Sequence, residues 1–448
     1  MSPVSEVSSG LDTIIKAKPR RSNLQNAPPS RQRETSTGMT ERVTSHEPEA
    51  DGRYAWWRLL ASVGLSTIGG IGIWSSVVVL PSIEIEFGVD RGGASLPYFA
   101  TMIGLAIGGI VIGRLSDRFG IMPLLIFSSV MLGGGYVVSS QVTSYWQFVL
   151  VQAVMIGMLG ASGSFGPLVA DISLWFKKRR GIAVAIVASG NYLAGAVWPP
   201  ILEQMIEAVG WRQTHMTVGI FCTLAMLPLC LILRRRSSAI DDSSPENTPR
   251  QIANTNLSPK ALQALLVIAG LACCIAMAMP QVHIVAYCLD LGYGTARGAE
   301  ILSIMLALGI VSRLVSGWIA DHIGGVGTLI LGSTLQCLAL FLYLPFDGLA
   351  PLYIVSAIFG LSQGGIVPSY ALIVRDYFPA KEAGARVSLV LMSTVVGMAL
   401  GGWMSGEIYD LTGSYQAAFL NGIAWNLLNM SIAFWLLFRP RFAKMAAS

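Results

Sequence analysis

The stretch GRLSDRFG, residues 113–120, returns in altered form as GWIADHIG, residues 317–324. Both copies have Gly, Asp and Gly at their first, fifth and eighth positions, and they start 204 residues apart. Two further pairs of landmarks have nearly the same spacing: Phe176 with Phe378, and GWRQT at 210–214 with GSYQA at 413–417. One spacing shared by three pairs indicates two parallel copies of one structural unit.

The composition indicates that these two units lie in a membrane. Of the 448 residues, 53% are hydrophobic and only 12% are charged, whereas soluble domains carry about 25% charged residues. A helix needs about 20 apolar residues to cross a hydrocarbon core of about 30 Å. We therefore predict an all-α membrane protein with twelve transmembrane helices in two six-helix repeats, near 57–81, 94–114, 121–140, 146–173, 181–203, 213–234, 261–286, 298–320, 325–345, 350–374, 384–408 and 415–438.

The basic residues predict the orientation. Of the 30 Lys and Arg residues, three (Arg91, Arg212 and Arg297) lie in loops on one side, Arg313 lies inside a helix, and the rest lie on the other side. Because basic loops stay in the cytoplasm, we expect a multi-pass protein of the plasma (inner) membrane with both termini cytoplasmic. The positive net charge is then explained by the basic residues that fix the orientation of the protein in the lipid bilayer. It requires no nucleic-acid partner.

Polar segments divide the chain. The first fifty residues are rich in Ser, Thr, Pro and mixed charge, which is typical of a disordered tail. We expect a cytoplasmic tail at 1–50, a first six-helix half at 51–236, a cytoplasmic linker at 237–258, a second half at 259–440 and a cytoplasmic tail at 441–448.

The loop motif at 113–120 resembles the signature of the major facilitator superfamily, and the resemblance covers all twelve predicted helices. It implies two six-helix halves that rock around a central site and open it alternately to each side of the membrane. It also implies a charged latch at the cytoplasmic face, with these gating residues: Gly113, Asp117 and Arg118 in the first copy, and Gly317 and Asp321 in the second.

Asp171, at the inner end of the fourth predicted helix, is a candidate partner for Arg118 or Arg114 in this latch. His322 replaces the arginine in the second copy, which would make that latch weaker or dependent on pH. The glycines of the motif would allow a tight turn and a close approach of helices. The alternative is that these charges only cap helices and set the topology.

A narrower resemblance is to the monocarboxylate transporters and the bacterial oxalate:formate antiporters. It is carried by three stretches: DGRYAW at 51–56, WFKKRRGIAVAIVASGNYLAG at 175–195 and MPQVHIVAY at 279–287. The resemblance implies transport of small organic anions and a substrate-binding arginine in the eighth helix. Two departures are that these carriers have an aspartate four residues before the arginine, where this chain has Gly309, and a lysine in the first helix, which this chain lacks.

Arg313 is the arginine at that place, in an otherwise apolar stretch. It lies eight residues before Asp321, hence roughly 12 Å deeper in the membrane at about 1.5 Å per residue. A charge at this depth costs about 2.5–3.5 kcal/mol, and no predicted helix offers a carboxylate at a similar depth. The missing counter-ion could be a carboxylate substrate, which a guanidinium grips with two donors. The alternative is an arginine satisfied by backbone carbonyls at a broken helix, or one that reaches to the cytoplasmic face.

His283 is the candidate for coupling to protons, and Tyr287, four residues later, shares its face of the helix. Gln281 would point nearly the opposite way. A histidine that only forms a structural hydrogen bond is the alternative. Asn191 and Gln363 are further candidates to line the substrate site, and they could equally hold helices together.

The sequence therefore predicts a secondary active transporter of small organic anions, mono- or dicarboxylates, with protons as a possible second partner. A carrier of another solute class, such as drug or metabolite efflux, and a non-transporting membrane sensor are the alternatives. We expect no enzyme, because the four histidines have no zinc-binding spacing and no nucleophile motif occurs. No cofactor and no metal site are expected.

Overall fold

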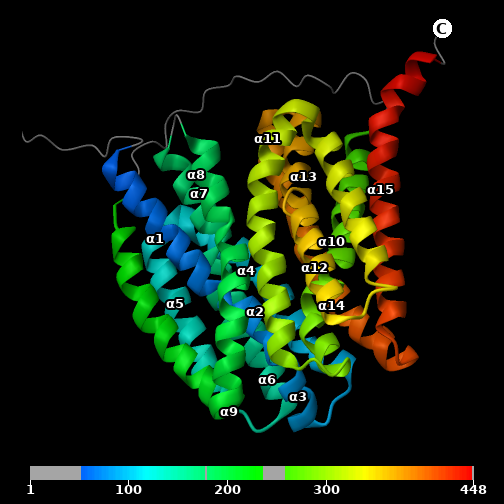
Figure 1. Ribbon diagram of the computed structural model, residues 1–448. Helices are drawn as coiled ribbons and strands as arrows, with labels where there is room; N and C mark the ends of the chain where they lie inside the picture. Colours follow the sequence, from blue (N-terminus) through cyan, green and yellow to red (C-terminus); the bar gives the residue numbers. More distant parts are fainter. Residues whose placement is uncertain (1–51, 177–178, 236–257, 446–448) are drawn as a thin grey trace, which may run out of the picture. The chain divides into compact units, whose positions relative to one another are not determined.

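The computed structural model describes residues 52–176, 179–235 and 258–445 (Figure 1). Within these ranges the regular structure is helical, without strands. The predicted tail at 1–50 and the predicted linker, apart from its last residue, lie outside the described residues. The prediction of an all-α membrane protein is confirmed.

The first half begins at Arg53, four residues before the predicted start. It consists of α1 Arg53–Gly69, α2 Ile71–Val78, α3 Leu80–Phe87, α4 Arg91–Phe119, α5 Ile121–Ser139, α6 Tyr145–Val151, η1 Gln152–Gly160, η2 Ala161–Ser164, α7 Gly166–Trp175, α8 Arg180–Ala188 and α9 Gly190–Ile232. The second half consists of α10 Pro259–Asp290, α11 Thr295–Leu342, α12 Leu349–Gln363, α13 Ile366–Tyr377, α14 Ala380–Thr412 and α15 Tyr415–Met445.

Ten segments of the described chain are long and apolar enough to cross a membrane. Two of them exceed one crossing: α11 has 48 residues, about 70 Å at 1.5 Å per residue. Each of these long segments contains one residue with non-helical backbone, Gly210 in α9 and Gly324 in α11. Dividing the two segments at these glycines gives the twelve expected crossings.

Four turn glycines occupy matching places in the two repeats. Gly120 and Gly324 have φ values of 85° and 75°, and Gly210 and Gly413 have φ values of 80° and 65°. A side chain with a Cβ is strained in this region, so glycine sets where the chain reverses direction. The tight turn expected from the motif is present, and its last glycine makes it.

Several crossings are interrupted rather than continuous. The fifth breaks at Ser189, between α8 and α9, and the tenth breaks at Gly364 and Gly365, between α12 and α13. A helix end leaves backbone carbonyls without their helical donors. Such breaks are tolerated at membrane depth only where the protein supplies other partners.

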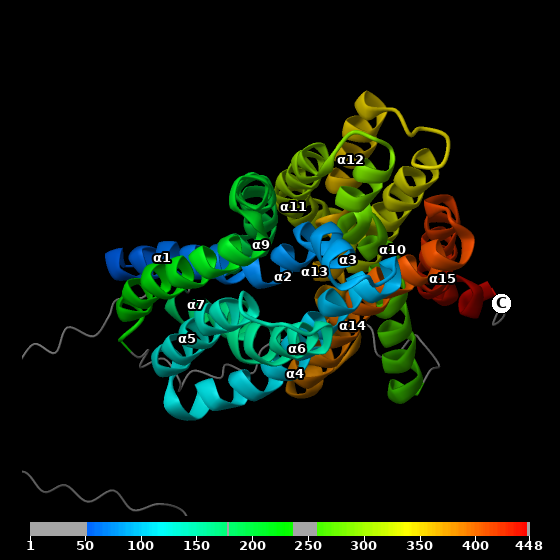
Figure 2. The same ribbon diagram turned by 90° about the horizontal axis from the view of Figure 1, so that it is seen from below.

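The chain has two ends along the helix direction, which Figure 1 shows at top and bottom. We call the end where α9 stops and α10 starts the linker end, and the end where α4 starts the Arg91 end. Figure 2 shows α4 beside α14 and α9 beside α11, and these pairs join the two halves.

The halves meet closely at the Arg91 end. A Cβ on Gly406 of α14 would lie 2.8 Å from the carbonyl oxygen of Arg91, and one on Gly402 would lie 2.9 Å from the ring of Tyr98 in α4. Toward the linker end, no described atom would lie within 4 Å of a Cβ on Gly113 of α4 or Gly384 of α14. The two helices therefore approach each other closely at the Arg91 end, and these two glycines give no such contact toward the linker end.

The predicted partner of Asp171 is wrong. Asp171 of α7 pairs with Arg58 of α1, and both of its oxygens accept a hydrogen bond of 2.7 Å from the guanidinium. Arg58 is 1% exposed and lies 4.5 Å from the ring of Trp175. Because α1 starts earlier than expected, Arg58 lies inside the bundle, whereas Arg114 and Arg118 are exposed.

Asp171→Asn should destabilise the protein, because it leaves a buried guanidinium without its counter-charge. Removing one partner of a buried pair costs about 3–5 kcal/mol, which thermal unfolding in detergent would detect. Asp376→Asn is the matched control, since Asp376 is exposed and pairs with no described residue. Equal unfolding temperatures for the two variants would contradict a structural role for the pair.

Candidate functional site

Arg313 lies where the two halves meet. Its Nη1 donates a 2.7 Å hydrogen bond to the carbonyl of Ala188, the last residue of α8. Its Nε lies 3.4 Å from the carbonyl of Gly364, the residue after α12, which is a weak hydrogen bond. Both carbonyls belong to helix breaks. One cation therefore bridges a break in the first half and a break in the second.

These contacts match the alternative of an arginine held by carbonyls at a broken helix, and they leave its charge uncompensated. No carboxylate of the described residues lies within 4.0 Å of the Arg313 guanidinium. A carbonyl carries only a partial negative charge, and two of them orient the group without neutralising it. The site thus keeps a net positive charge.

Tyr192 of α9 covers one face of this cation. Its ring centre lies 4.4 Å from the guanidinium carbon of Arg313, within the range of a cation–π interaction. Gly309, one turn before Arg313, makes the approach possible, because a Cβ there would lie 2.7 Å from the Tyr192 ring.

Gln363 lies next to the same place. Its Nε2 would be 3.6 Å from a Cβ on Gly309, and it is buried without a hydrogen-bond partner among the described residues. Its Oε1 accepts a hydrogen bond from Nε2 of Gln281. Gln281 was not among the predicted site residues, although an amide in the apolar helix 259–290 was a signal that could have found it.

Asn191 lies beside Tyr192 on the first-half side. Its backbone carbonyl accepts a 3.2 Å hydrogen bond from the indole of Trp74. Its side-chain Oδ1 is buried and has no partner among the described residues, and the same holds for the hydroxyl of Ser66 in α1. Asn191 and Ser66 in the first half and Gln363 in the second thus keep buried polar atoms without partners among the described residues.

The structure does not bring His283 and Tyr287 to Arg313. His283 is 0% exposed, and its Nε2 lies 2.7 Å from the carbonyl of Gly402 in α14. Both rings lie against Tyr415 of α15, at centroid distances of 5.8 Å and 5.0 Å. They share a face as predicted, but that face packs within the second half.

The predicted latch is not formed by the described side chains. Arg118 is exposed, with its guanidinium carbon 5.4 Å from the Phe119 ring, and exposed Asp321 forms no ion pair with a described residue. The side chain of Asp117 lies outside the description. The close helix approach expected at Gly113 and Gly317 is wrong for this structure, because no described atom would lie within 4 Å of a Cβ on either glycine.

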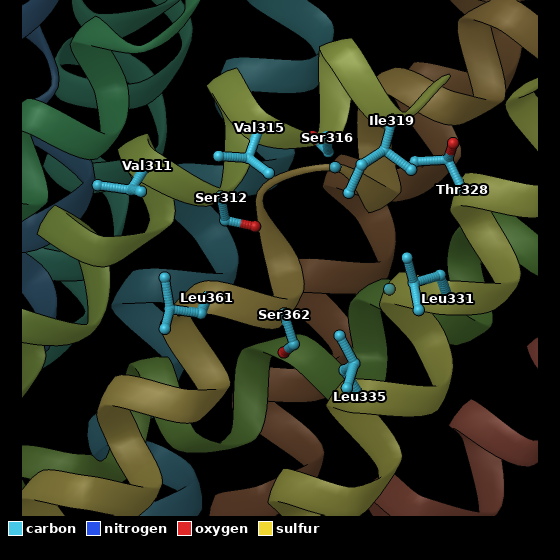
Figure 3. Close-up of a pocket in the computed structure, with 12 residues that line it drawn as sticks. Val311, Ser312, Val315, Ser316, Ile319, Thr328, Leu331, Leu335, Leu361 and Ser362 are labelled. Carbon is cyan, nitrogen blue, oxygen red and sulfur yellow. The ribbon is translucent and has the colours of Figure 1, made fainter. Parts of the chain in front are cut away.

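A pocket of about 120 Å³ lies between α11 and α12 (Figure 3). Val311, Val315 and Leu361 on its rim are nearly half exposed, so it opens on the outer surface of the bundle. It contains no charged side chain. The hydroxyls that line it form hydrogen bonds with nearby backbone groups; for example, the Ser312 hydroxyl accepts from the backbone N–H of Gly364. This apolar pocket is not suited to an anion.

The donors of Arg313 offer recognition of an anion. A guanidinium has five N–H donors in a fixed fork, and backbone carbonyls accept from two of them here. Within the described residues no group of three His, Cys, Asp or Glu side chains could hold a metal ion. The arrangement can bind a planar anion and hold it between the halves.

Gly309→Ala should lower the unfolding temperature in detergent, because the new methyl group overlaps the Tyr192 ring. Overpacking of this kind costs about 1–3 kcal/mol. Gly317→Ala, on the same helix, meets open space and should have no such cost. In a Tyr192→Ala background the cost of Gly309→Ala should disappear. An equal cost in both backgrounds would show that the tyrosine does not occupy this space.

Known proteins are similar to the chain over most of its length. The model of the Major Facilitator Superfamily matches residues 63–355 and 327–448. MFS-type transporter 1 of Ophiocordyceps sp. is 28% identical over 80% of this chain and 82% of its own. Monocarboxylate transporter 13 of Rattus norvegicus is 25% identical over 83% and 86%.

A solved structure has the same fold. The bacterial homolog of the human lysosomal transporter Spinster, in an inward-facing and unoccupied conformation, superposes with a TM-score of 0.65. It is 14% identical and covers 87% of this chain and 97% of its own. The repeats, the broken crossings and the match of the family model agree, and the chain belongs to the major facilitator superfamily of membrane transporters.

Proposed function

We propose that the protein is a secondary active carrier of small organic anions, mono- or dicarboxylates, that works by rocking of its two halves. The observation that carries the proposal is Arg313, a cation that lies between the halves and has no carboxylate partner among the described residues. The printed name of the rat relative, a monocarboxylate transporter, supports the same substrate class.

A carboxylate substrate would supply what the site lacks. The Arg313 guanidinium stays protonated at every physiological pH, and charge-assisted hydrogen bonds to a carboxylate are about twice as strong as neutral ones. The Ala188 carbonyl and the Tyr192 ring hold the guanidinium in place. A neutral solute would gain much less from this arrangement.

The position of Arg313 couples binding to movement. Its hydrogen bond to Ala188 joins the second half to the first, and its contact with Gly364 lies within the second half. An anion that takes up donors of this group changes how strongly the halves are joined at mid-depth. Binding can therefore shift the balance between conformations.

The orientation belongs to the same proposal. The linker end is the cytoplasmic end, since the basic residues gather there, and the protein lies in the plasma membrane with both termini in the cytoplasm. Contact of the halves at the Arg91 end then means that this structure is closed toward the outside. The gating roles of Gly113, Asp117, Arg118, Gly317 and Asp321 belong to the opposite conformation, in which the halves would meet at the linker end.

Arg313→Gln should abolish uptake of labelled carboxylates into proteoliposomes while the protein still inserts. Each hydrogen bond to a charged group contributes about 1.5–3 kcal/mol, so losing two weakens binding at least about a hundredfold. Arg297→Gln is the control, because Arg297 is an exposed residue paired with Glu300, and it should transport normally.

Three results would contradict this function. Near-normal carboxylate uptake by Arg313→Gln would remove the arginine from the site. Uptake of neutral drugs or metabolites, independent of Arg313, would identify a carrier of another solute class. Carboxylate binding without any movement in the wild-type protein would identify a sensor.

A further inference from the structure

Arg91, which the sequence placed in an outward loop, is a buried residue that joins the two halves. It is 5% exposed and is the first residue of α4. Its Nη1 donates a 2.6 Å hydrogen bond to the hydroxyl of Tyr415, and its Nη2 lies 3.2 Å from Oδ1 of Asp290. Both partners belong to the second half.

Glu84 of α3 is the partner of Arg91 within the first half. Its Oε2 lies 2.9 Å from Nε of Arg91, an ion pair without the alignment of a hydrogen bond, since this buried Nε has no hydrogen-bond partner among the described residues. Its Oε1 is 3.4 Å from Nη2. The better-aligned bonds of Arg91 thus go to the second half, and Glu84 is held mainly by charge.

Asp410, near the end of α14, binds the start of α4. Its two carboxylate oxygens accept hydrogen bonds from the backbone N–H groups of Arg91, at 3.0 Å, and Gly92, at 2.5 Å. A Cβ on Gly92 would also lie 2.5 Å from the Glu407 carboxylate. A helix start carries roughly half a positive charge, so these contacts join the halves through a second set of attractions.

Negative charge exceeds positive charge in this cluster. Glu84 and Asp290 lie at the guanidinium, and Asp410, Glu407 and the N-cap residue Asp90 lie at the helix start. Fully ionised, these five carboxylates exceed the positive charges by about three and a half. Neighbouring like charges favour binding of a proton to one of the carboxylates.

We infer that Glu84 is a proton-binding site, and that a proton bound there favours the conformation in which the two halves are closed at the Arg91 end. Glu84 is the carboxylate that pairs with the Arg91 guanidinium from within the first half, and it lies in α3, outside the membrane-spanning segments. When Glu84 is protonated, Arg91 keeps only its hydrogen bonds to Asp290 and Tyr415, and these bonds close this end. The inference deepens the proposed function, because it assigns the predicted proton partner to this cluster rather than to His283.

The surroundings of Glu84 give the sign of the effect. The charged and titratable groups that face it are Arg91 of α4, Asp290 of α10, Tyr409 and Asp410 of α14, and Tyr415 of α15. Burial raises the pKa of the Glu84 carboxyl; Arg91 opposes the rise, and Asp290 and Asp410 add to it.

Opening of the Arg91 end would return water to Glu84 and remove the second-half carboxylates, so its pKa would fall toward the ordinary value. A group whose pKa is higher in the closed conformation binds its proton more tightly there. Closure is therefore favoured as the pH falls, and the advantage is lost as the pH rises through the closed-state pKa.

Pulsed electron paramagnetic resonance distances between spin labels at Val209→Cys and Leu411→Cys would test the inference. These residues are 54% and 84% exposed, one in each half near the Arg91 end, and the six native cysteines are buried. Lowering the pH from about 7.5 to about 5 should raise the ratio of short to long distances, by at most tenfold per pH unit for one proton. The measurement needs no substrate, so its outcome is separate from that of carboxylate uptake.

Glu84→Gln mimics the protonated carboxyl, so at both pH values it should give the ratio of short to long distances that the wild type shows at low pH. Arg91→Gln should increase the share of long distances between the labels. Glu86→Gln is the matched control, because Glu86 pairs with Arg212 within the first half, and it should respond to pH as the wild type does. If Glu84→Gln does not fold, Asp290→Asn should move the transition to lower pH. A pH-independent wild type, or an unchanged response in Glu84→Gln or Asp290→Asn, would overturn the inference.

Discussion

A permanent positive charge inside a hydrocarbon layer must be satisfied by the protein or by its cargo, and this constraint organises the centre of the molecule. Arg313 reaches two carbonyls that helix breaks have released, one in each half, and the face of Tyr192. These partners fix the orientation of the guanidinium without cancelling its charge. The breaks after Ala188 and Gln363 thus supply hydrogen-bond acceptors for the guanidinium at this depth. Without them, an anion would be its only source of acceptors.

Three arginines, at three levels, use different partners and so have different consequences. Arg58 is fully paired with Asp171 inside one half and contributes to the rigidity of that half. Arg91 is shared among partners from both halves and holds one end closed. Arg313 has no carboxylate among the described residues. An arginine that is fully paired within one half stabilises that half, and an arginine paired across the halves can hold them together at one end. An arginine without a carboxylate partner can bind an anion.

Much of the fold could be predicted because its signals are local. Apolar runs mark the crossings, and the repeat places turn glycines at Gly120 and Gly324, whose positive φ values fit only glycine well. The isolation of Arg313 was predictable for the same reason, because a charged residue within an apolar run is recognised from the sequence alone. The partner of Asp171 was not predictable, because the pair joins residues 113 positions apart. The Arg91 cluster was missed because its members come from five separate helices.

Selection of an anion by the charge of Arg313 can be measured as thermal stabilisation of the protein by a carboxylic acid and by its primary amide. The two compounds have nearly the same shape and differ in charge. We expect the carboxylate to raise the unfolding temperature of the wild-type protein, the amide to leave it unchanged, and Arg313→Gln to lose this difference. Equal stabilisation by acid and amide, or a difference that persists in Arg313→Gln, would contradict selection by this charge.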